Sequence, residues 1–171
     1  MKSLIANICI LGMIGIVIGT GVFADTEAQV TATVKVQNIS VSVTDGTVDY
    51  GTLVAGGVED TTTNGVNESQ TATNDGNVTE DFNIKGEDVS AGCSWTLAAT
   101  QGDEQYFHKF CTSDCDSNPT WTALTTDYQT LATGVSESGS QVFDLQIGVP
   151  SSTTCTAQAT ATVTVQAVAG S

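Results

Sequence analysis

The densest group of potential metal ligands in this sequence is the segment Asp114–Asn118, which reads Asp-Cys-Asp-Ser-Asn. This alternation places three oxygen ligands on one side of a turn, as calcium-binding loops do. The segment is not an EF-hand, because it lacks the glycine that should follow and the glutamate at loop position twelve. A simpler calcium site is one hypothesis, and an acidic solvated loop is the other. The candidate calcium ligands are Asp114, Asp116 and Asn118.

Four cysteines lie beyond the apolar N-terminal segment: Cys93, Cys111, Cys115 and Cys155. An even number of cysteines in an exported chain indicates two disulfides, for which three pairings are possible. The short spacing favours a bond between Cys111 and Cys115, which leaves Cys93 to pair with Cys155. Zinc binding is the alternative, but a C-x3-C pair with one distant histidine is poor ligand spacing.

Residues suited to covalent or acid-base catalysis are scarce. The single histidine, His108, belongs to no H-E-x-x-H motif, and no carboxylate in the sequence marks it as the base of a catalytic triad. Ser94 lacks a G-x-S-x-G context, and oxidised cysteines leave no thiolate nucleophile. A glycosidase-like acid pair is the remaining catalytic alternative, since acidic residues are abundant. We therefore expect no enzymatic activity and no cofactor other than calcium.

Aromatic residues on one exposed face could bind carbohydrate, which is the second binding chemistry open to this chain. The candidates are Tyr106, Trp121 and Tyr128. Aromatic residues make up only 6% of the chain, and Trp121 suits a core position equally well. An extracellular module that binds calcium or carbohydrate without catalysis is accordingly the alternative function.

The chain is strongly acidic, with 19 aspartates and glutamates against four basic residues and a formal net charge of −15. All of the acidic residues lie from Asp25 onward. A surface of this charge repels nucleic acid and anionic lipid, so both are excluded as partners. Salt or divalent cations would relieve the self-repulsion. A saline setting and an ordinary solvated surface both account for this balance.

Residues 1–24 are typical of an export signal. Lys2 precedes an uncharged, mostly apolar run that ends at Val22-Phe23-Ala24, where small residues at the first and third positions suit cleavage after Ala24. The alternative is a retained anchor helix, because about 20 apolar residues can just span a bilayer. Cleavage predicts a signal-peptide helix over 1–24 and one secreted domain over 25–171. We expect this domain outside the cell or at the cell surface.

Alternation with a period of two dominates the chain after Asp25, and no helical periodicity is sustained. Segments 30–36 and 157–167 alternate Val or Ala with Thr, Lys or Gln, as in strands with one buried face. Asp-Gly, Asn-Gly and Lys-Gly turns separate the shorter runs, which is typical of an antiparallel β-sandwich of Ig-like or jelly-roll type. The core aromatic is expected to be Trp95, packed with Phe82, Phe143 and Leu145. The shorter predicted strands are Thr47–Leu53, Ser69–Thr73, Thr79–Lys85, Ser94–Ala99, Gln105–Phe110, Trp121–Leu124 and Gln141–Val149.

Three motifs suggest a family. They are Thr47-Val-Asp-Tyr-Gly-Thr-Leu53, Thr73-Asn-Asp-Gly-Asn77 and Phe82-Asn-Ile84. In this order, from Val30 to Ile84, the chain resembles secreted camelysin-type biofilm-matrix subunits and related archaeal bundling pili. The resemblance implies a sandwich whose N-terminal strand can complete the sheet of a neighbouring copy, and it carries over no catalytic residue. The paired cysteines and Trp95 depart from that pattern.

The residues themselves also favour strand addition. Val30, Val34 and Val36 share one face of an N-terminal segment that precedes the other strands. The alternative is that this segment pairs within its own domain, as edge strands usually do. We therefore expect a structural or adhesive surface protein whose partners are further copies of itself or other surface proteins.

Overall fold

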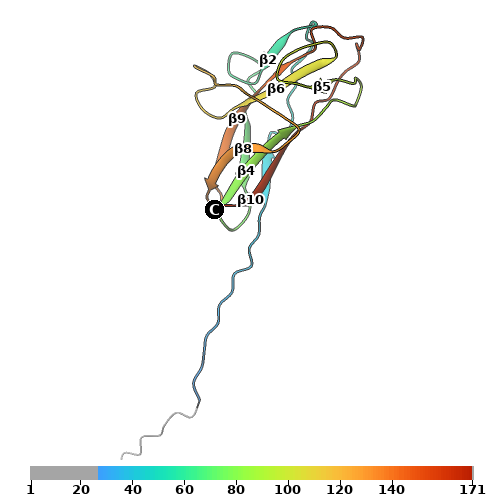
Figure 1. The fold of residues 1–171 in the computed structure, drawn as a ribbon. Coiled ribbons are helices and arrows are strands. Elements are labelled where there is room, and N and C mark those ends of the chain that lie inside the picture. The colour runs from blue at the N-terminus through green and yellow to red at the C-terminus, as the bar shows by residue number, and fades with distance from the viewer. Residues whose placement is uncertain (1–26, 171) are drawn as a thin grey trace, which may run out of the picture. The chain divides into compact units, whose positions relative to one another are not determined.

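The computed structural model describes residues 27–170, and in that range the protein is all-β, with ten strands and no helix (Figure 1). The chain divides into two units, Met1–Val34 and Lys35–Ser171, which are described separately below. The predicted signal peptide and its helix, residues 1–24, lie outside the described residues. Within the described range, no helix is long and apolar enough to cross a membrane.

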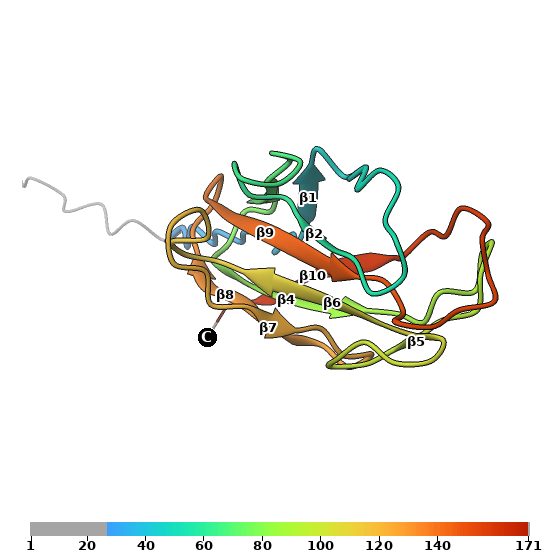
Figure 2. The ribbon, with the colours of Figure 1, turned by 90° about the horizontal axis from the view of Figure 1, so that it is seen from above.

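The larger sheet has seven strands, with β1, β3, β9, β6 and β5 in spatial order. Its central strands β9 and β6 lie side by side in Figure 2. Two short strands extend it, since β2 also pairs with β9 and β7 also pairs with β6. All of these pairs are antiparallel except β5 with β6, which is parallel. The bounds are β1 Val41–Thr44, β2 Val58–Asp60, β3 Gln70–Asn74, β5 Thr96–Leu97, β6 Gln105–Cys111, β7 Thr122–Ala123 and β9 Ser140–Gly148.

The smaller sheet has three antiparallel strands in the order β10, β4, β8. Its central strand is β4 (Glu80–Gly86), flanked by β8 (Gln129–Val135) and β10 (Val163–Ala169). The ladder between β4 and β10 is regular from Glu80↔Ala169 to Gly86↔Val163. The ladder between β4 and β8 shifts its register around Phe82, which indicates a bulge or irregularity there.

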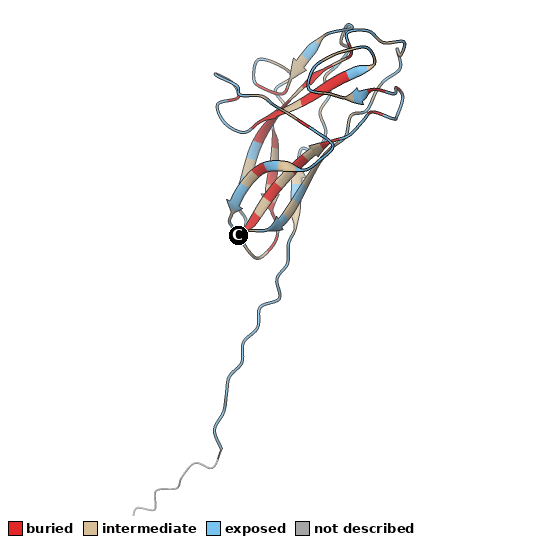
Figure 3. Ribbon diagram, viewed as in Figure 1, coloured by how far each residue is buried: buried red, intermediate tan, exposed pale blue. Residues whose placement is uncertain are grey.

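The first hydrophobic cluster lies where the two sheets face each other. Alternate residues of β4 are buried, so one face of this strand, including Phe82 and Ile84, points into the core. Phe143 and Leu145 from β9 and Phe110 from β6 supply the other side of the same cluster. Buried residues accordingly run along β4, β6 and β9 (Figure 3), and the fold is a sandwich-like all-β arrangement.

A second cluster surrounds Trp95. Its buried members are Val89, Cys93, Trp95, Tyr106 and Ile147. The tryptophan is therefore a core aromatic, as expected, but the expected partners Phe82, Phe143 and Leu145 belong to the first cluster. The reason is that the chain around Trp95 has little regular pairing. It forms one isolated bridge, Val89 with Trp95, and the two-residue strand β5.

The described part of the first unit, residues 27–34, contains no strand and is exposed throughout. Val30 and Val34 are each 92% exposed, although the alternation of this segment predicts a strand with a buried face. In the second unit, Val36 is also exposed. The prediction of a strand over 30–36 is therefore wrong for the isolated chain.

Candidate functional site

The candidate calcium segment forms a tight turn after β6. The backbone carbonyl of Asp114 accepts hydrogen bonds from the amides of Ser117 and Asn118, and Asp114 has a positive φ of 52°. Asp116 instead faces a neighbouring loop, where its Oδ1 accepts from the Thr63 amide at 2.7 Å and from the Thr63 hydroxyl at 2.8 Å. These hydrogen bonds from Thr63 hold the pKa of the Asp116 carboxyl below its ordinary value.

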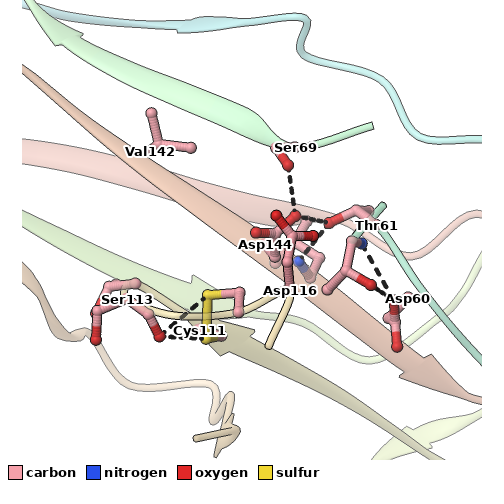
Figure 4. The surroundings of a disulfide bond; sticks show 12 residues. Asp60, Thr61, Ser69, Cys111, Ser113, Asp116, Val142 and Asp144 are labelled. Carbon is pink, nitrogen blue, oxygen red and sulfur yellow. Dashed lines mark hydrogen bonds between the residues drawn. A yellow bond between two sulfur atoms is a disulfide. The ribbon is translucent and has the colours of Figure 1, made fainter. Parts of the chain in front are cut away.

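The loop that contacts Asp116 is also fixed to β9. Asp144 is buried and accepts hydrogen bonds from the Thr61 hydroxyl at 2.8 Å and the Ser69 hydroxyl at 2.7 Å, as Figure 4 shows. The Thr61 hydroxyl accepts in turn from the Leu145 amide at 2.8 Å. The Thr61 and Ser69 hydroxyls both donate to Oδ1 of the Asp144 carboxylate, which offsets part of the cost of burying it. Asp116 and Asp144 therefore hold the loop around Thr61 and Thr63 in place.

No group of three or more His, Cys, Asp or Glu side chains in residues 27–170 is arranged to hold a metal ion. Asp114, Asp116 and Asn118 are exposed, and one Asp116 oxygen is occupied by Thr63. Calcium binding by these three residues stays a prediction.

Both disulfides are present with the pairing that the sequence favours. Cys111 and Cys115 close the small loop beside Asp116, and both cysteines are buried. Cys93 joins Cys155 across 62 residues, and it belongs to the second hydrophobic cluster. The two bonds thus fasten different regions, one a loop at the end of β6 and the other the chain that leads into β10.

A groove of about 860 Å³ lies in the second unit. Its apolar floor comes from Trp95 and from Phe143, Leu145 and Ile147 of β9. At one end the groove is flanked by Val43 of β1 and by Val163 and Val165 of β10, the latter two only half-buried. Each of these two strands pairs with one neighbour only, β1 with β3 and β10 with β4. The groove therefore lies between an edge of each sheet.

Residues 47–53 form the first wall of the groove. They contribute Val48, Tyr50 and Leu53 to its lining. Val48 and Tyr50 share one face of the predicted strand Thr47–Leu53, whereas Leu53 falls on the other face. The structure contains no strand there, so this prediction is wrong. Within the described chain, none of these residues makes a backbone–backbone hydrogen bond. The wall is held instead by side chains, such as the Glu68 carboxylate that accepts from the Asp49 amide.

Residues 157–162 form the second wall. Ala157, Ala159 and Ala161 line the groove, and the alternation of the predicted strand 157–167 runs through them. The strand begins only at Val163, because its partner β4 ends at Gly86, opposite Val163. Residues 157–162 consequently extend past the end of the ladder, and no backbone–backbone hydrogen bond involves them in the described range. Two segments with strand patterns thus face one groove, and neither has a ladder partner.

A polar pair lies within the groove lining. The Tyr50 hydroxyl is 2.9 Å from His108 Nε2, and His108 Nδ1 is buried without a hydrogen-bond partner among the described residues. Burial lowers the pKa of His108 to about 4, so the imidazole is neutral near pH 7. Burial, reinforced by the negative charges of Asp60 and Glu68, raises the pKa of the Tyr50 phenol, which stays protonated. A neutral pair of this kind ties the first wall to β6.

The three aromatic residues proposed for carbohydrate binding do not form one exposed platform. Tyr106 is fully buried in the second cluster, and its hydroxyl donates to the Glu87 carbonyl. Trp121 is half-buried, and Tyr128 is 44% exposed beside Lys85. The inclusion of Tyr106 as an exposed residue was wrong, because β6 directs it inward toward Trp95.

The point at which the N-terminal segment joins the second unit is tightly bonded. Asn77 holds this point from both ends of its side chain, since Oδ1 accepts from the Asn38 amide and Nδ2 donates to the Val36 carbonyl. The Lys35 ammonium donates to the Asn77 carbonyl at 2.6 Å. Farther along, the Ser40 amide donates to Glu80 Oε1, and Glu80 is fully buried. Residues 35–40 are therefore held to the second unit by hydrogen bonds.

Sequence inspection missed the groove and the role of Tyr50 in it. The available signal was the alternation of residues 47–53 and 157–162, but alternation does not reveal whether a neighbouring strand is long enough to pair with them.

The chain matches no protein-family model, and no curated protein or solved structure is significantly similar to it. The resemblance to camelysin-type and pilus-type subunits therefore stays a prediction.

Proposed function

We propose that the protein is a secreted or cell-surface structural subunit that assembles by strand addition, without catalysis. In this proposal the segment around Val30–Val36 of one copy enters the groove of a second copy. One observation carries the proposal: residues 47–53 and 157–162 are predicted strands that line one groove with an apolar floor, and neither has a ladder partner in the described chain. An added strand would supply the missing backbone hydrogen bonds on either wall.

The N-terminal segment has the chemistry of such a strand. Its exposed valines, Val30, Val34 and Val36, alternate with polar residues, so that one face is apolar and the other is polar. Burying a valine side chain contributes about 1.5–3 kcal/mol relative to leaving it exposed. Burial of three valines and the new ladder hydrogen bonds would both favour insertion. The conformational entropy that the segment loses on insertion would offset part of this gain.

The finer fold class follows from the same picture. We propose an Ig-like or jelly-roll sandwich in which the added strand fills the place between the edges formed by β1 and β10. Export is supported by the two disulfides, which are typical of oxidising compartments, and by the leader pattern of residues 1–24. The acidic surface suits a protein that remains soluble until a specific contact draws copies together.

The test is assembly of the chain that starts at Asp25, followed by size-exclusion chromatography, light scattering and electron microscopy over a range of concentrations. We expect oligomers or fibres that disappear when residues 25–34 are deleted. A strict monomer at the highest concentration, with the N-terminal segment intact, would contradict the proposal.

A matched pair of variants distinguishes strand addition from nonspecific association. Val30→Asn with Val34→Asn places two asparagines on the apolar face, and Thr31→Asn with Thr33→Asn places two asparagines on the face that is already polar. We expect the first pair to abolish assembly and the second to preserve it. Equal effects of both pairs would show that the alternation of this segment is irrelevant to assembly.

A further inference from the structure

We propose that the disulfide Cys93–Cys155 completes the acceptor groove, so that the chain becomes competent to assemble only after this bond has formed. This inference rests on the proposed function, because it concerns the same groove. It assigns to the cysteines a positioning role: they hold one wall of the groove in place for the incoming strand.

The wall that needs this support is the segment 155–162. Its start is fixed, because the Glu104 carboxylate accepts hydrogen bonds from the Thr153 hydroxyl and from the amide and hydroxyl of Thr154. Its end is fixed where the β10 ladder begins at Val163. Between these two points, no backbone–backbone hydrogen bond occurs in the described chain. A segment without ladder bonds orders only if something else compensates for its conformational entropy.

The disulfide supplies that attachment at Cys155, which itself lines the groove. Its partner Cys93 is 4% exposed and packs in the second cluster with Val89 and Trp95. The bond thus ties the wall to a buried residue of the second cluster. The other disulfide, Cys111–Cys115, contributes no residue to the groove lining. The two bonds therefore differ in what they should do for assembly.

A second contact brings the Cys93 loop against the same wall. Gly92 has a positive φ of 81°, and a Cβ at this position would lie 1.9 Å from the Gln158 carbonyl oxygen. The backbone at Gly92 thus approaches the wall more closely than any residue with a side chain could. This contact offers a way to displace the wall while leaving both cysteines in place.

The proposed order of events follows from thiol chemistry. In a reducing cytosol both residues are thiols. The wall is then held by hydrogen bonds at its two ends and, between them, by the packing of Ala159 and Ala161 against the second cluster. After export, the two thiols lose two protons and two electrons to a disulfide oxidant, which is reduced to a dithiol as the Cys93–Cys155 bond forms. The groove then presents both walls, and assembly begins outside the cell rather than inside it. A dithiol reductant would reverse the step and itself become a disulfide.

The experiment compares three forms of the chain that starts at Asp25: native, Cys93→Ser with Cys155→Ser, and Cys111→Ser with Cys115→Ser. Circular dichroism checks that each retains its strands, and hydrogen exchange follows residues 155–162. We expect the loss of Cys93–Cys155 to raise exchange in this segment and to raise the concentration needed for assembly about tenfold or more, as when only a tenth of the molecules keep a formed site. The loss of Cys111–Cys115 should change neither quantity.

The outcomes separate this inference from the proposed function. If the native chain does not assemble, strand addition fails, and hydrogen exchange at 155–162 still decides whether the disulfide orders the wall. If the native chain and the Cys93→Ser, Cys155→Ser variant assemble alike, strand addition stands and the role of the disulfide is overturned.

A glycine variant covers the case in which the cysteine variant does not fold. Gly92→Ala keeps both disulfides but drives a Cβ into the Gln158 carbonyl, whereas Gly134→Ala introduces the same change at a similar φ of 67° with no atom within 4 Å. We expect Gly92→Ala to weaken assembly several-fold more than Gly134→Ala. Equal assembly by the two alanine variants would contradict a requirement for a positioned wall.

Discussion

The two hydrophobic clusters of the protein are covered in different ways. The first, around Phe82 and Phe143, lies between two sheets whose strands are bonded to one another along continuous ladders, with a register shift only between β4 and β8. The second, around Trp95, is covered by the two-residue strand β5, a disulfide, and segments 47–53 and 157–162, which have no ladder. Apolar burial alone therefore does not close a sandwich, and the side that lacks ladders is where a further strand can be accommodated.

This difference also has a dynamic consequence. Backbone amides within a regular ladder exchange only when strands separate, whereas segments held by side chains open at low free energy. We expect the walls of the groove to be the first part of the second unit to open. The predictions below test this contrast, from the largest expected effect to the smallest.

Phe82→Ala should cause the largest loss of stability. Phe82 is fully buried between the sheets, and removing its ring leaves a cavity that the ladders on both sides prevent from collapsing. We expect the free energy of unfolding to fall by about 3–5 kcal/mol, measured by urea denaturation of the chain that starts at Asp25. A loss below about 1 kcal/mol would mean that the first cluster is not the stable half of the molecule.

Acid should destabilise the protein through His108. Its folded pKa is lowered from 6.5 to about 4, so the unfolded chain binds the proton more tightly between these values. Stability is then lost as the pH falls from about 6.5 to about 4, by about 3 kcal/mol in total. The measurement is urea denaturation at several pH values, with His108→Phe as the control. An unchanged slope in this variant over the same window would remove His108 as the cause.

Thr61→Val should cost about 1–3 kcal/mol. The substitution leaves the buried Asp144 carboxylate without one of its two donors and leaves the Leu145 amide without its acceptor. The matched control is Thr63→Val, which removes the exposed hydrogen bond to Asp116, and we expect a smaller loss there. Thermal denaturation of both variants gives the comparison. If both variants lost the same stability, the buried hydrogen bonds of Thr61 would contribute no more than the exposed hydrogen bond of Thr63.

Val34→Asn should have the smallest effect on stability. The side chain is 92% exposed, so the free energy of unfolding of the monomer should change by less than about 0.5 kcal/mol. Denaturation of dilute monomer measures this quantity. A loss above about 1 kcal/mol would show that the N-terminal segment packs within its own chain, which is the alternative that its sequence pattern leaves available.

The sequence was sufficient to predict the all-β class and the presence of disulfide bonds, because period-two alternation and an even number of cysteines report these features locally. It was insufficient for the groove. Residues 157–162 and 163–167 share one alternating pattern, yet only the latter pair, since β4 ends at Gly86. The inward position of Tyr106 and the division of Trp95 from Phe82 depend likewise on which strands adjoin, and no local pattern records that.

The most direct test of the central claim is hydrogen exchange of the chain that starts at Asp25, compared between dilute monomer and assembled material. If an added strand occupies the groove, residues 47–53 and 157–162 should exchange rapidly in the monomer and become protected on assembly, together with residues 30–36. Assembly that leaves both walls as unprotected as in the monomer would contradict the account.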